Sequence, residues 1–161
     1  MDERDVTILK AIADLETGSP ERLHEETGIP VSTIHYRLNK LRESGVIEND
    51  LYDVDLEAAG LGVTVVLEVL TDYSGTHHEV GEKLADIEGV TQVYFTMGET
   101  DFMVIAHLSG REMVERLITD FERLDEVDRT NSTFVVSTVA DTNSALQSYG
   151  LETLVAELAD E

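Results

Sequence analysis

A basic segment in the N-terminal third of the chain carries the side chains best suited to contact nucleic acid. Residues 27–42 contain no Asp or Glu, although the whole chain has 34 of them against 11 Lys and Arg. Arg37 and Asn39 can form bidentate hydrogen bonds with base edges, and Lys40 can neutralise a phosphate. The other residues expected to contact DNA are Ser32, Thr33, His35, Tyr36 and Arg42. The segment therefore predicts an interface with double-stranded DNA.

Three short helices are expected to hold this segment. Apolar residues recur at helical spacing over residues 4–16, and a second helix runs from Ser19-Pro20 to Gly28. A tight turn follows, with Ser32 as the expected N-cap of the third helix. The buried side of that helix would consist of Val31, Ile34, Leu38 and Leu41. Two helices joined by a short turn containing glycine are typical of a helix-turn-helix, the alternative being a small helical bundle with a solvated basic face.

The net charge of −23 at first argues against a nucleic-acid partner. Residues 1–50 carry eleven acids and six bases (net −5), and residues 51–161 carry 23 acids and five bases (net −18). The acid-free segment is an exception within a strongly acidic surface. Such a surface suits a salt-rich cytoplasm, because at about 1 M salt the Debye length is only about 3 Å. We therefore expect a cytoplasmic protein from an extreme halophile that binds DNA at high salt.

The chain offers little support for other chemistry. It has no cysteine, no phosphate-binding loop, no nucleophile elbow and no H-E-x-x-H motif, so we expect no enzyme activity, no cofactor and no metal. His77, His78 and Glu82 could hold a metal, but such residues on an acidic helix are more often solvated. His107 is expected to be a hydrogen-bonded core or interface residue. No segment is long and apolar enough for a membrane span, so no membrane partner is expected.

A change of hydrophobic period near residues 50–60 indicates a second domain. Residues 46–54 are expected to be a short extended segment with a turn at Asn49-Asp50. Strands are then expected at 61–70, 90–97, 102–108 and 130–140, and helices at 76–88 and 111–124. This order is the ferredoxin-like βαββαβ arrangement, with both helices on one face of a four-stranded antiparallel sheet.

The opposite face of that sheet would expose apolar side chains. The segments 61–70 and 134–139 would place apolar side chains on both faces of the sheet. The chain has no spare element large enough to cover the second face. A second copy would cover this face, so the sequence predicts a homodimer. The tail, residues 142–161, contains a short amphipathic helix at 151–158. That helix could cap the sheet domain or contact a neighbouring subunit.

The connection between the two central strands has two interpretations. In the simpler one it is a tight hairpin, in which Gly98 supplies a positive φ and Asp101 bonds to the backbone. In the other one, exposed N–H groups of the loop bind a carboxylate, and the acids Glu99 and Asp101 bind an ammonium group. From the residues alone the simpler interpretation is favoured.

The chain resembles the Lrp/AsnC family of archaeal and bacterial transcription regulators, also called feast/famine regulators. Its N-terminal half shares three motifs with the family: Asp5-Val6-Thr7-Ile8-Leu9, the stretch from Gly28 and Ser32 to Arg37-Leu38-Asn39-Lys40-Leu41, and Gly45-Val46-Ile47. The C-terminal half shares the hairpin motif Gly98-x-x-Asp101-Phe102. His24, the acidic surface and the tail after Asp141 depart from the family pattern.

The resemblance implies an α+β fold and a regulatory function. A winged helix-turn-helix (residues 1–50) and a linker (51–60) would precede a ferredoxin-like effector-binding and oligomerisation domain (61–141) and the tail (142–161). It implies dimers that bind promoter DNA and assemble to tetramers or octamers, and a small effector, an amino acid, that changes oligomeric state or DNA binding. The effector site would comprise Met97, Gly98, Glu99, Thr100 and Asp101, with Phe134, Val135 and Val136 as secondary members. The alternative is a ligand-sensing or assembly protein that does not touch DNA.

Overall fold

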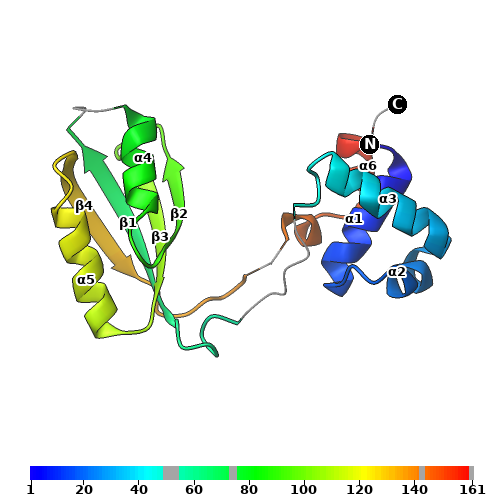
Figure 1. The fold of residues 1–161 in the computed structure, drawn as a ribbon, viewed down its shortest axis with the longest axis horizontal. Helices are drawn as coiled ribbons and strands as arrows, with labels where there is room; N and C mark the ends of the chain where they lie inside the picture. Colours follow the sequence, from blue (N-terminus) through cyan, green and yellow to red (C-terminus); the bar gives the residue numbers. More distant parts are fainter. Residues whose placement is uncertain (49–54, 73–75, 142–143, 160–161) are drawn as a thin grey trace. The chain divides into compact units, whose positions relative to one another are not determined.

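The computed structural model describes residues 1–48, 55–72, 76–141 and 144–159, which form two units (Figure 1). The first unit comprises Met1–Asp53 together with Ala140–Glu161, and the second comprises Val54–Val139. The turn expected at Asn49-Asp50, together with the start of the linker, lies outside the described residues. No helix of the described chain has the length and apolar character needed to cross a membrane.

Three helices at the start of the chain have the capping residues that their sequence predicts. They are α1 (Glu3–Leu15), α2 (Pro20–Thr27) and α3 (Val31–Glu43). Asp2 and Asp5 form a capping box at the start of α1, each carboxylate accepting from the other residue's backbone N–H at 3.0 Å. Ser19 caps α2, which begins with Pro20 at its first turn.

The turn between α2 and α3 is closed by glycine and by a histidine. Gly28 ends α2 with φ +69°, a left-handed conformation that glycine adopts without steric cost. His24 donates from Nδ1 to the carbonyl of Ile29 at 2.8 Å, which ties α2 to the turn. The expected N-cap of α3, Ser32, is wrong. Pro30 is the N-cap and its carbonyl accepts from the N–H groups of residues 33 and 34, so Ser32 already lies inside the helix.

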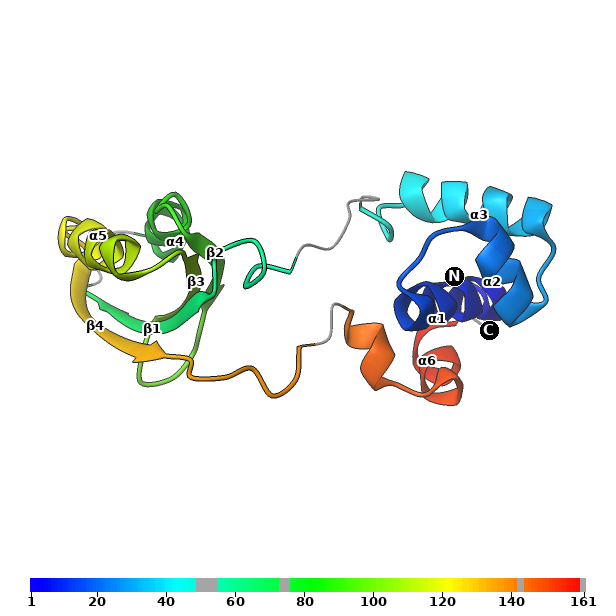
Figure 2. The same cartoon turned by 90° about the horizontal axis from the view of Figure 1, so that it is seen from below.

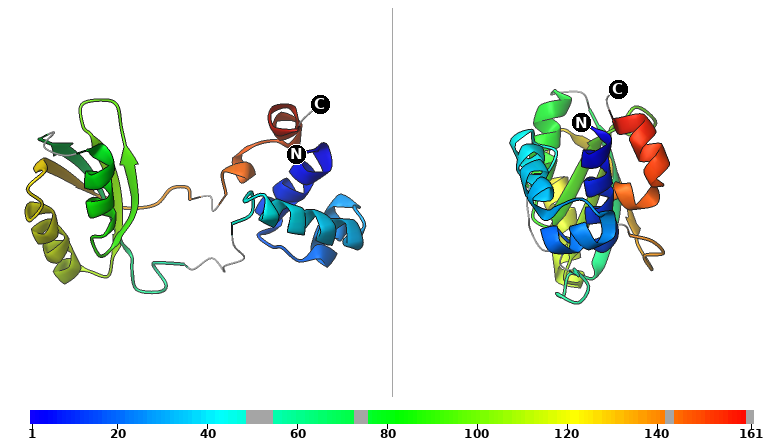
Figure 3. Two further views of the ribbon diagram at one scale, coloured as in Figure 1. Left: turned by 45° about the horizontal axis from the view of Figure 1, so that its top comes forward. Right: turned by 90° about the vertical axis from the view of Figure 1, so that its right-hand side faces the viewer.

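The C-terminal tail packs against α1 within the first unit. It forms a short 3₁₀ helix, η1 (Ala145–Ser148), and the helix α6 (Leu151–Leu158), which coincides with the helix expected there. The two tail helices lie beside α1 (Figures 2 and 3). Leu154 is 4% exposed, and Gln147 donates from Nε2 to the carbonyl of Ala13. The tail thus lies on α1, a location that the sequence did not indicate, while contact of the tail with a neighbouring subunit stays a prediction.

The second unit is a four-stranded antiparallel sheet with two helices on one face (Figure 2). The elements in chain order are β1 (Val63–Thr71), α4 (His77–Ala85), β2 (Val90–Phe95), β3 (Phe102–Leu108), α5 (Arg111–Glu122) and β4 (Val127–Phe134). The strand order is β2-β3-β1-β4, as the ferredoxin-like arrangement requires. The buried core lies between sheet and helices and is built around Leu67, Val104, Phe102, Leu84 and Phe121.

The last strand is placed earlier in the chain than expected. We expected residues 130–140, whereas β4 ends at Phe134. The reason is its partner: Phe134 pairs with Val65, and Val135 donates to the carbonyl of Thr64, so β1 offers little further backbone to pair with. At the other end, the polar residues from 129 to 133 pair with β1 even though they lack an apolar pattern.

The sheet face opposite the helices carries apolar side chains that no described element covers. Alternation along β1 and β3 places Val66, Leu70, Met103 and Ile105 on this face, with Tyr94 of β2 opposite Met103. Met103 is 37% exposed and Tyr94 is 51% exposed. This surface, called the open sheet face below, is the one for which the sequence predicts a partner.

Candidate DNA interface and effector loop

The outer side of α3 presents most of the residues expected to contact DNA. Its inner side buries Ile34 and Leu38 in the core of the first unit, and Leu41 is buried as well. Because the helix has 3.6 residues per turn, the positions on the side opposite these residues project outward. The exposed set is Ser32, His35, Tyr36, Asn39, Lys40 and Arg42, and Thr33 is half-buried. We refer to this set as the α3 outer face.

Two contacts organise the α3 outer face. Lys40 places its ammonium 5.9 Å from the ring centre of Tyr36, within the range of a cation–π interaction. Arg42 donates from Nη1 to the side-chain oxygen of Asn39 at 3.4 Å. Tyr36 is 62% exposed, so its hydroxyl and ring face solvent. The face combines a cation, an amide and an aromatic ring, which can contact phosphates and base edges.

Arg37 does not belong to the α3 outer face. Its Nη1 donates to Oδ1 of Asp2 and to Oδ1 of Asp5, both at 2.7 Å, and its side chain is only 17% exposed. Its Nε is buried and has no hydrogen-bond partner among the described residues. The expectation that Arg37 faces DNA is therefore at odds with the structure, which turns this side chain toward the first turn of α1.

The position of Arg37 relative to the buried residues of α3 predicts this placement. Arg37 lies three residues after Ile34 and four before Leu41, so it flanks the buried stripe of α3. The hydrogen bond that Arg37 donates to Asp5 raises the pKa of Arg37 above its ordinary value despite burial, and the one to Asp2 adds to this. A guanidinium in this position stays charged and bound to the two carboxylates.

The loop between β2 and β3 is held by Asp101. The carboxylate of Asp101 is buried and accepts from the N–H of Thr71 at 2.8 Å and from its hydroxyl at 2.9 Å. The backbone N–H of Asp101 donates to Val69 at 3.0 Å. On the other side of the loop, Thr96 donates from its N–H to Asp101 at 2.8 Å and from its hydroxyl to Thr100 at 2.7 Å. Asp101 thus fastens the loop to the end of β1.

The middle of this loop is open to solvent. Met97 is 96% exposed, Gly98 and Glu99 are exposed, and Thr100 is half-buried. The expected left-handed φ at Gly98 is wrong: among the described residues the glycines with φ between +20° and +160° are 28, 45, 60 and 89. The bonds made by Thr96 and Asp101 close a wider loop, which does not require a left-handed residue. A Cβ added at Gly98 would meet no atom within 4 Å.

The secondary effector candidates lie at the other end of β1 from this loop. Phe134 pairs with Val65, whereas Asp101 bonds to Thr71, six residues further along the strand. At about 3.3 Å per residue this is a separation of roughly 20 Å. Phe134 is 50% exposed and Val136 is 98% exposed, and Val135 is exposed as well. A single chain therefore does not bring the two groups of candidates together.

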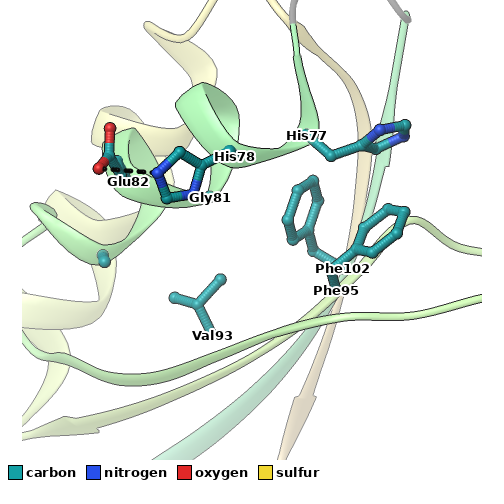
Figure 4. Close-up of a pocket in the computed structure, with 8 residues that line it drawn as sticks. His77, His78, Gly81, Glu82, Val93, Phe95 and Phe102 are labelled. Atoms are coloured by element: carbon teal, nitrogen blue, oxygen red, sulfur yellow. Dashed lines mark ion pairs between the residues drawn. The ribbon is translucent and has the colours of Figure 1, made fainter.

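A hollow of about 450 Å³ lies between α4 and β2, beside the base of the loop (Figure 4). Its walls include the ring of His77, 4.3 Å from the ring of Phe95, which in turn lies 5.5 Å from the ring of Phe102. Gly81 leaves the space open on the helix side. This hollow was not predicted from the sequence, although His77 and Gly81, four residues apart, share a helix face.

The histidines considered for metal binding and for the core have ordinary partners. His78 contacts Glu82 through Nε2 and Oε1 at 3.3 Å, and both are exposed, while His77 packs against Phe95 (Figure 4). In the described part of the chain, no three metal-binding side chains are grouped to hold an ion. His107 is half-buried on the open sheet face, and its Nδ1 lies 3.0 Å from the hydroxyl of Thr91.

Comparison with known protein families gives two matches that together span most of the chain. The winged helix-turn-helix DNA-binding family matches residues 1–48. The Lrp/AsnC ligand binding domain matches residues 64–145. The two matched regions contain the α3 outer face and the loop fastened by Asp101, respectively.

Individual relatives support the same assignment. HTH-type transcriptional regulator FL11 from Pyrococcus horikoshii is 30% identical over 142 residues, which cover 88% of this chain and 93% of the relative. Among solved structures, the L-Met complex of a transcriptional regulator from Neisseria meningitidis has a TM-score of 0.81 at 20% identity, covering 89% of this chain and 95% of that one. The L-methionine complex of a feast or famine regulatory protein from M. tuberculosis has a TM-score of 0.76 at 20% identity, with 87% and 95% coverage.

Proposed function

The chain belongs to the Lrp/AsnC family of DNA-binding transcription regulators, and we propose that an amino acid bound near the loop between β2 and β3 controls how it binds promoter DNA. The observation that carries the DNA-binding part is the α3 outer face. It lies on the second helix of a helix-turn-helix, the element that enters the major groove in this motif. Asn39 would contact base edges, and Lys40 and Arg42 would contact phosphates.

The effector part rests on the loop and on the relatives. Met97, Gly98, Glu99 and Thr100 leave backbone and carboxylate groups open to solvent, while Asp101 keeps the loop in place. Two structural neighbours are complexes with methionine, which supports an amino acid as the ligand class. Because Phe134, Val135 and Val136 lie far from the loop in one chain, a site containing both groups would form between copies.

The open sheet face supports assembly of copies. Its apolar side chains, including Val66 and Ile105, would be buried by the same face of a second copy in a two-fold dimer. We propose this dimer as the basic unit and, from the family, a tetramer or octamer built from it. Effector binding between copies would then be linked to assembly and so to the spacing of the DNA-binding units.

We propose that the acidic surface is an adaptation to a salt-rich cytoplasm, in which this protein would bind its promoter DNA. The relative FL11 comes from Pyrococcus and does not support a halophilic source. The proposed adaptation to high salt therefore rests on the net charge of −23 alone. The α3 outer face lies in the segment without acids, which would let DNA approach there while the rest of the surface stays acidic.

The DNA-binding part is tested with a duplex enriched from a random-sequence library by the purified protein. The Lys40→Ala variant should bind this duplex more weakly, because one phosphate contact is lost. For the same reason, the slope of log affinity against log salt concentration should become less negative by about 0.9. A matched control is Lys83→Ala, on α4 of the other unit. Failure to enrich any duplex would favour the alternative, a ligand sensor that does not touch DNA.

The effector part is tested by thermal shift with the twenty common amino acids. The Gly98→Val variant is the sharpest probe, because the added side chain meets open space within the chain and φ at Gly98 is not left-handed. It should fold with unchanged stability and lose the shift that a binding amino acid gives to the unaltered protein. An unchanged shift would place the ligand elsewhere.

A further inference from the structure

We infer that Arg37 is a positioning residue, which fixes the rotation of α3 through Asp2 and Asp5 and so sets the direction of the side chains that contact DNA. The inference deepens the proposed function, since it assumes that the α3 outer face is the DNA interface. It assigns Arg37 to the support of that interface and not to contact with DNA itself.

The apolar contacts of α3 do not by themselves fix its rotation. Ile34 and Leu38 pack in the core of the first unit and Leu41 is buried, but apolar burial has no directional preference. Hydrogen bonds between a guanidinium and carboxylates are directional, and those to charged groups are stronger than neutral ones. A bonded arginine at the edge of the apolar stripe can therefore hold the helix at one angle.

The partners of Arg37 are themselves held in place. Asp2 and Asp5 form the capping box of α1, so each carboxylate is bonded to backbone as well as to Arg37. They lie at the N-terminus of α1, where the helix dipole favours negative charge. The side chains of Arg37 and Asp5 are each 17% exposed, so solvent screens this contact little. The result is a polar link between the first turn of α1 and the middle of α3.

The same link keeps Arg37 away from DNA. Nη1 bonds to both carboxylates at 2.7 Å, and Nε is buried without a partner among the described residues. Contact with a phosphate would require the guanidinium to leave two carboxylates for one anion. The side chains of Asn39 and Lys40, by contrast, already project into solvent.

The decisive experiment is the DNA affinity of Asp5→Asn, measured with the library-enriched duplex. Simple electrostatics predicts tighter binding, because a negative charge is removed from the DNA-binding unit. Loss of the positioning contact predicts the opposite, weaker binding by about threefold or more. Glu43→Gln, which removes an exposed carboxylate from the same helix as Arg37, is the matched control and should not weaken binding.

Two further measurements separate positioning from direct contact. Arg37→Met should weaken binding but leave the slope of log affinity against log salt unchanged, whereas loss of a phosphate contact would reduce the slope by about 0.9. In the double variant Arg37→Met/Asp5→Asn, affinity should equal that of Arg37→Met alone, because the contact between Asp5 and Arg37 is already lost in the single variant.

Affinities are measured well below the unfolding temperature of each variant, so that a loss of stability alone does not change them. If Asp5→Asn does not fold, Asp2→Asn, which removes the more exposed carboxylate, replaces it with the same expected direction. Tighter binding by the Asp variant, or a reduced salt slope for Arg37→Met, would overturn the inference. If instead Lys40→Ala leaves binding unchanged, the proposed interface itself fails.

Discussion

The buried carboxylate of Asp101 accepts two hydrogen bonds from Thr71, one from its N–H at 2.8 Å and one from its hydroxyl at 2.9 Å. The two residues belong to different elements, since Thr71 ends β1 and Asp101 precedes β3. This contact makes Asp101 part of the framework of the loop between β2 and β3, the proposed effector site. Any ligand that binds there meets a carboxylate whose acceptor positions are already partly occupied.

Replacing Asp101 with alanine should therefore lower stability as well as remove the effector response. The N–H and hydroxyl of Thr71 would lose their acceptor in a buried place, which costs about 2–4 kcal/mol of unfolding free energy. Urea unfolding measures this, with Glu99→Ala, two residues away and exposed, as the control. An amino-acid-induced thermal shift of full size in Asp101→Ala would show that the loop is not the effector site.

Shortening a buried leucine of the tail should destabilise the first unit. Leu154→Ala removes a side chain that is 4% exposed, with an expected loss of about 2–4 kcal/mol. Leu158→Ala, on the same helix but 40% exposed, should cost clearly less. Urea unfolding followed by helical circular dichroism compares the two. Equal, small effects would mean that the tail does not pack on α1 in solution.

A charge placed on the open sheet face should prevent dimerisation. Ile105 lies on that face, and Ile105→Lys would bury an unpaired ammonium between two copies. Ile118→Lys is the matched control, because Ile118 is 41% exposed on α5, on the helix side of the sheet. Light scattering in about 1 M salt, used to screen surface charge, should show a monomer for the first variant and a dimer for the second. A dimer of Ile105→Lys would place the interface elsewhere.

The capping box should make the first unit sensitive to acid. Burial raises the pKa of Asp2, but hydrogen bonds from the backbone of Asp5 and from Arg37 outweigh it and lower this pKa below 3.8. Since the folded pKa is lowered, the stabilisation is complete above the unfolded value and disappears as the pH falls through the folded value. Asp2→Asn should thus be less stable than the unaltered protein at about pH 6, with a smaller difference near about pH 3. A pH-independent difference would contradict this.

The acidic surface should change the salt dependence of DNA binding. Carboxylates beside the DNA interface can take up cations on binding, which offsets the release of counterions from DNA. We expect a flat or positive slope of log affinity against log salt between about 0.3 and 2 M potassium chloride, where screening is strong. Fluorescence anisotropy with the enriched duplex measures the slope. A steep negative slope would contradict the proposed adaptation.

The sequence predicted the elements with strong periodicity and missed those set by distant partners. The strand from Phe102 to Leu108 and the helix from Leu151 to Leu158 were predicted with their observed bounds, because each has a clear apolar pattern. The end of β4 was missed, since it depends on where β1 begins. The sequence also gave no means of choosing α1 as the surface that receives the tail.

The candidate site residues show the same division. Exposure of Asn39 and Lys40 follows from helical spacing alone. The burial of Arg37 was missed because its type suggested DNA contact, although its spacing from Ile34 indicated otherwise. The bond between Asp101 and Thr71 joins residues 30 apart in the chain, a pairing that depends on the register of the whole sheet.

The hydrogen bond between Gln147 and Ala13 joins residues 134 positions apart. During synthesis the first three helices leave the ribosome early, but the surface of α1 that receives α6 stays uncovered until residues 151–158 are made. At about 5–20 residues per second this interval is on the order of ten seconds. A nascent chain that has not yet reached α6 therefore lacks the packing that covers this side of α1 in the first unit.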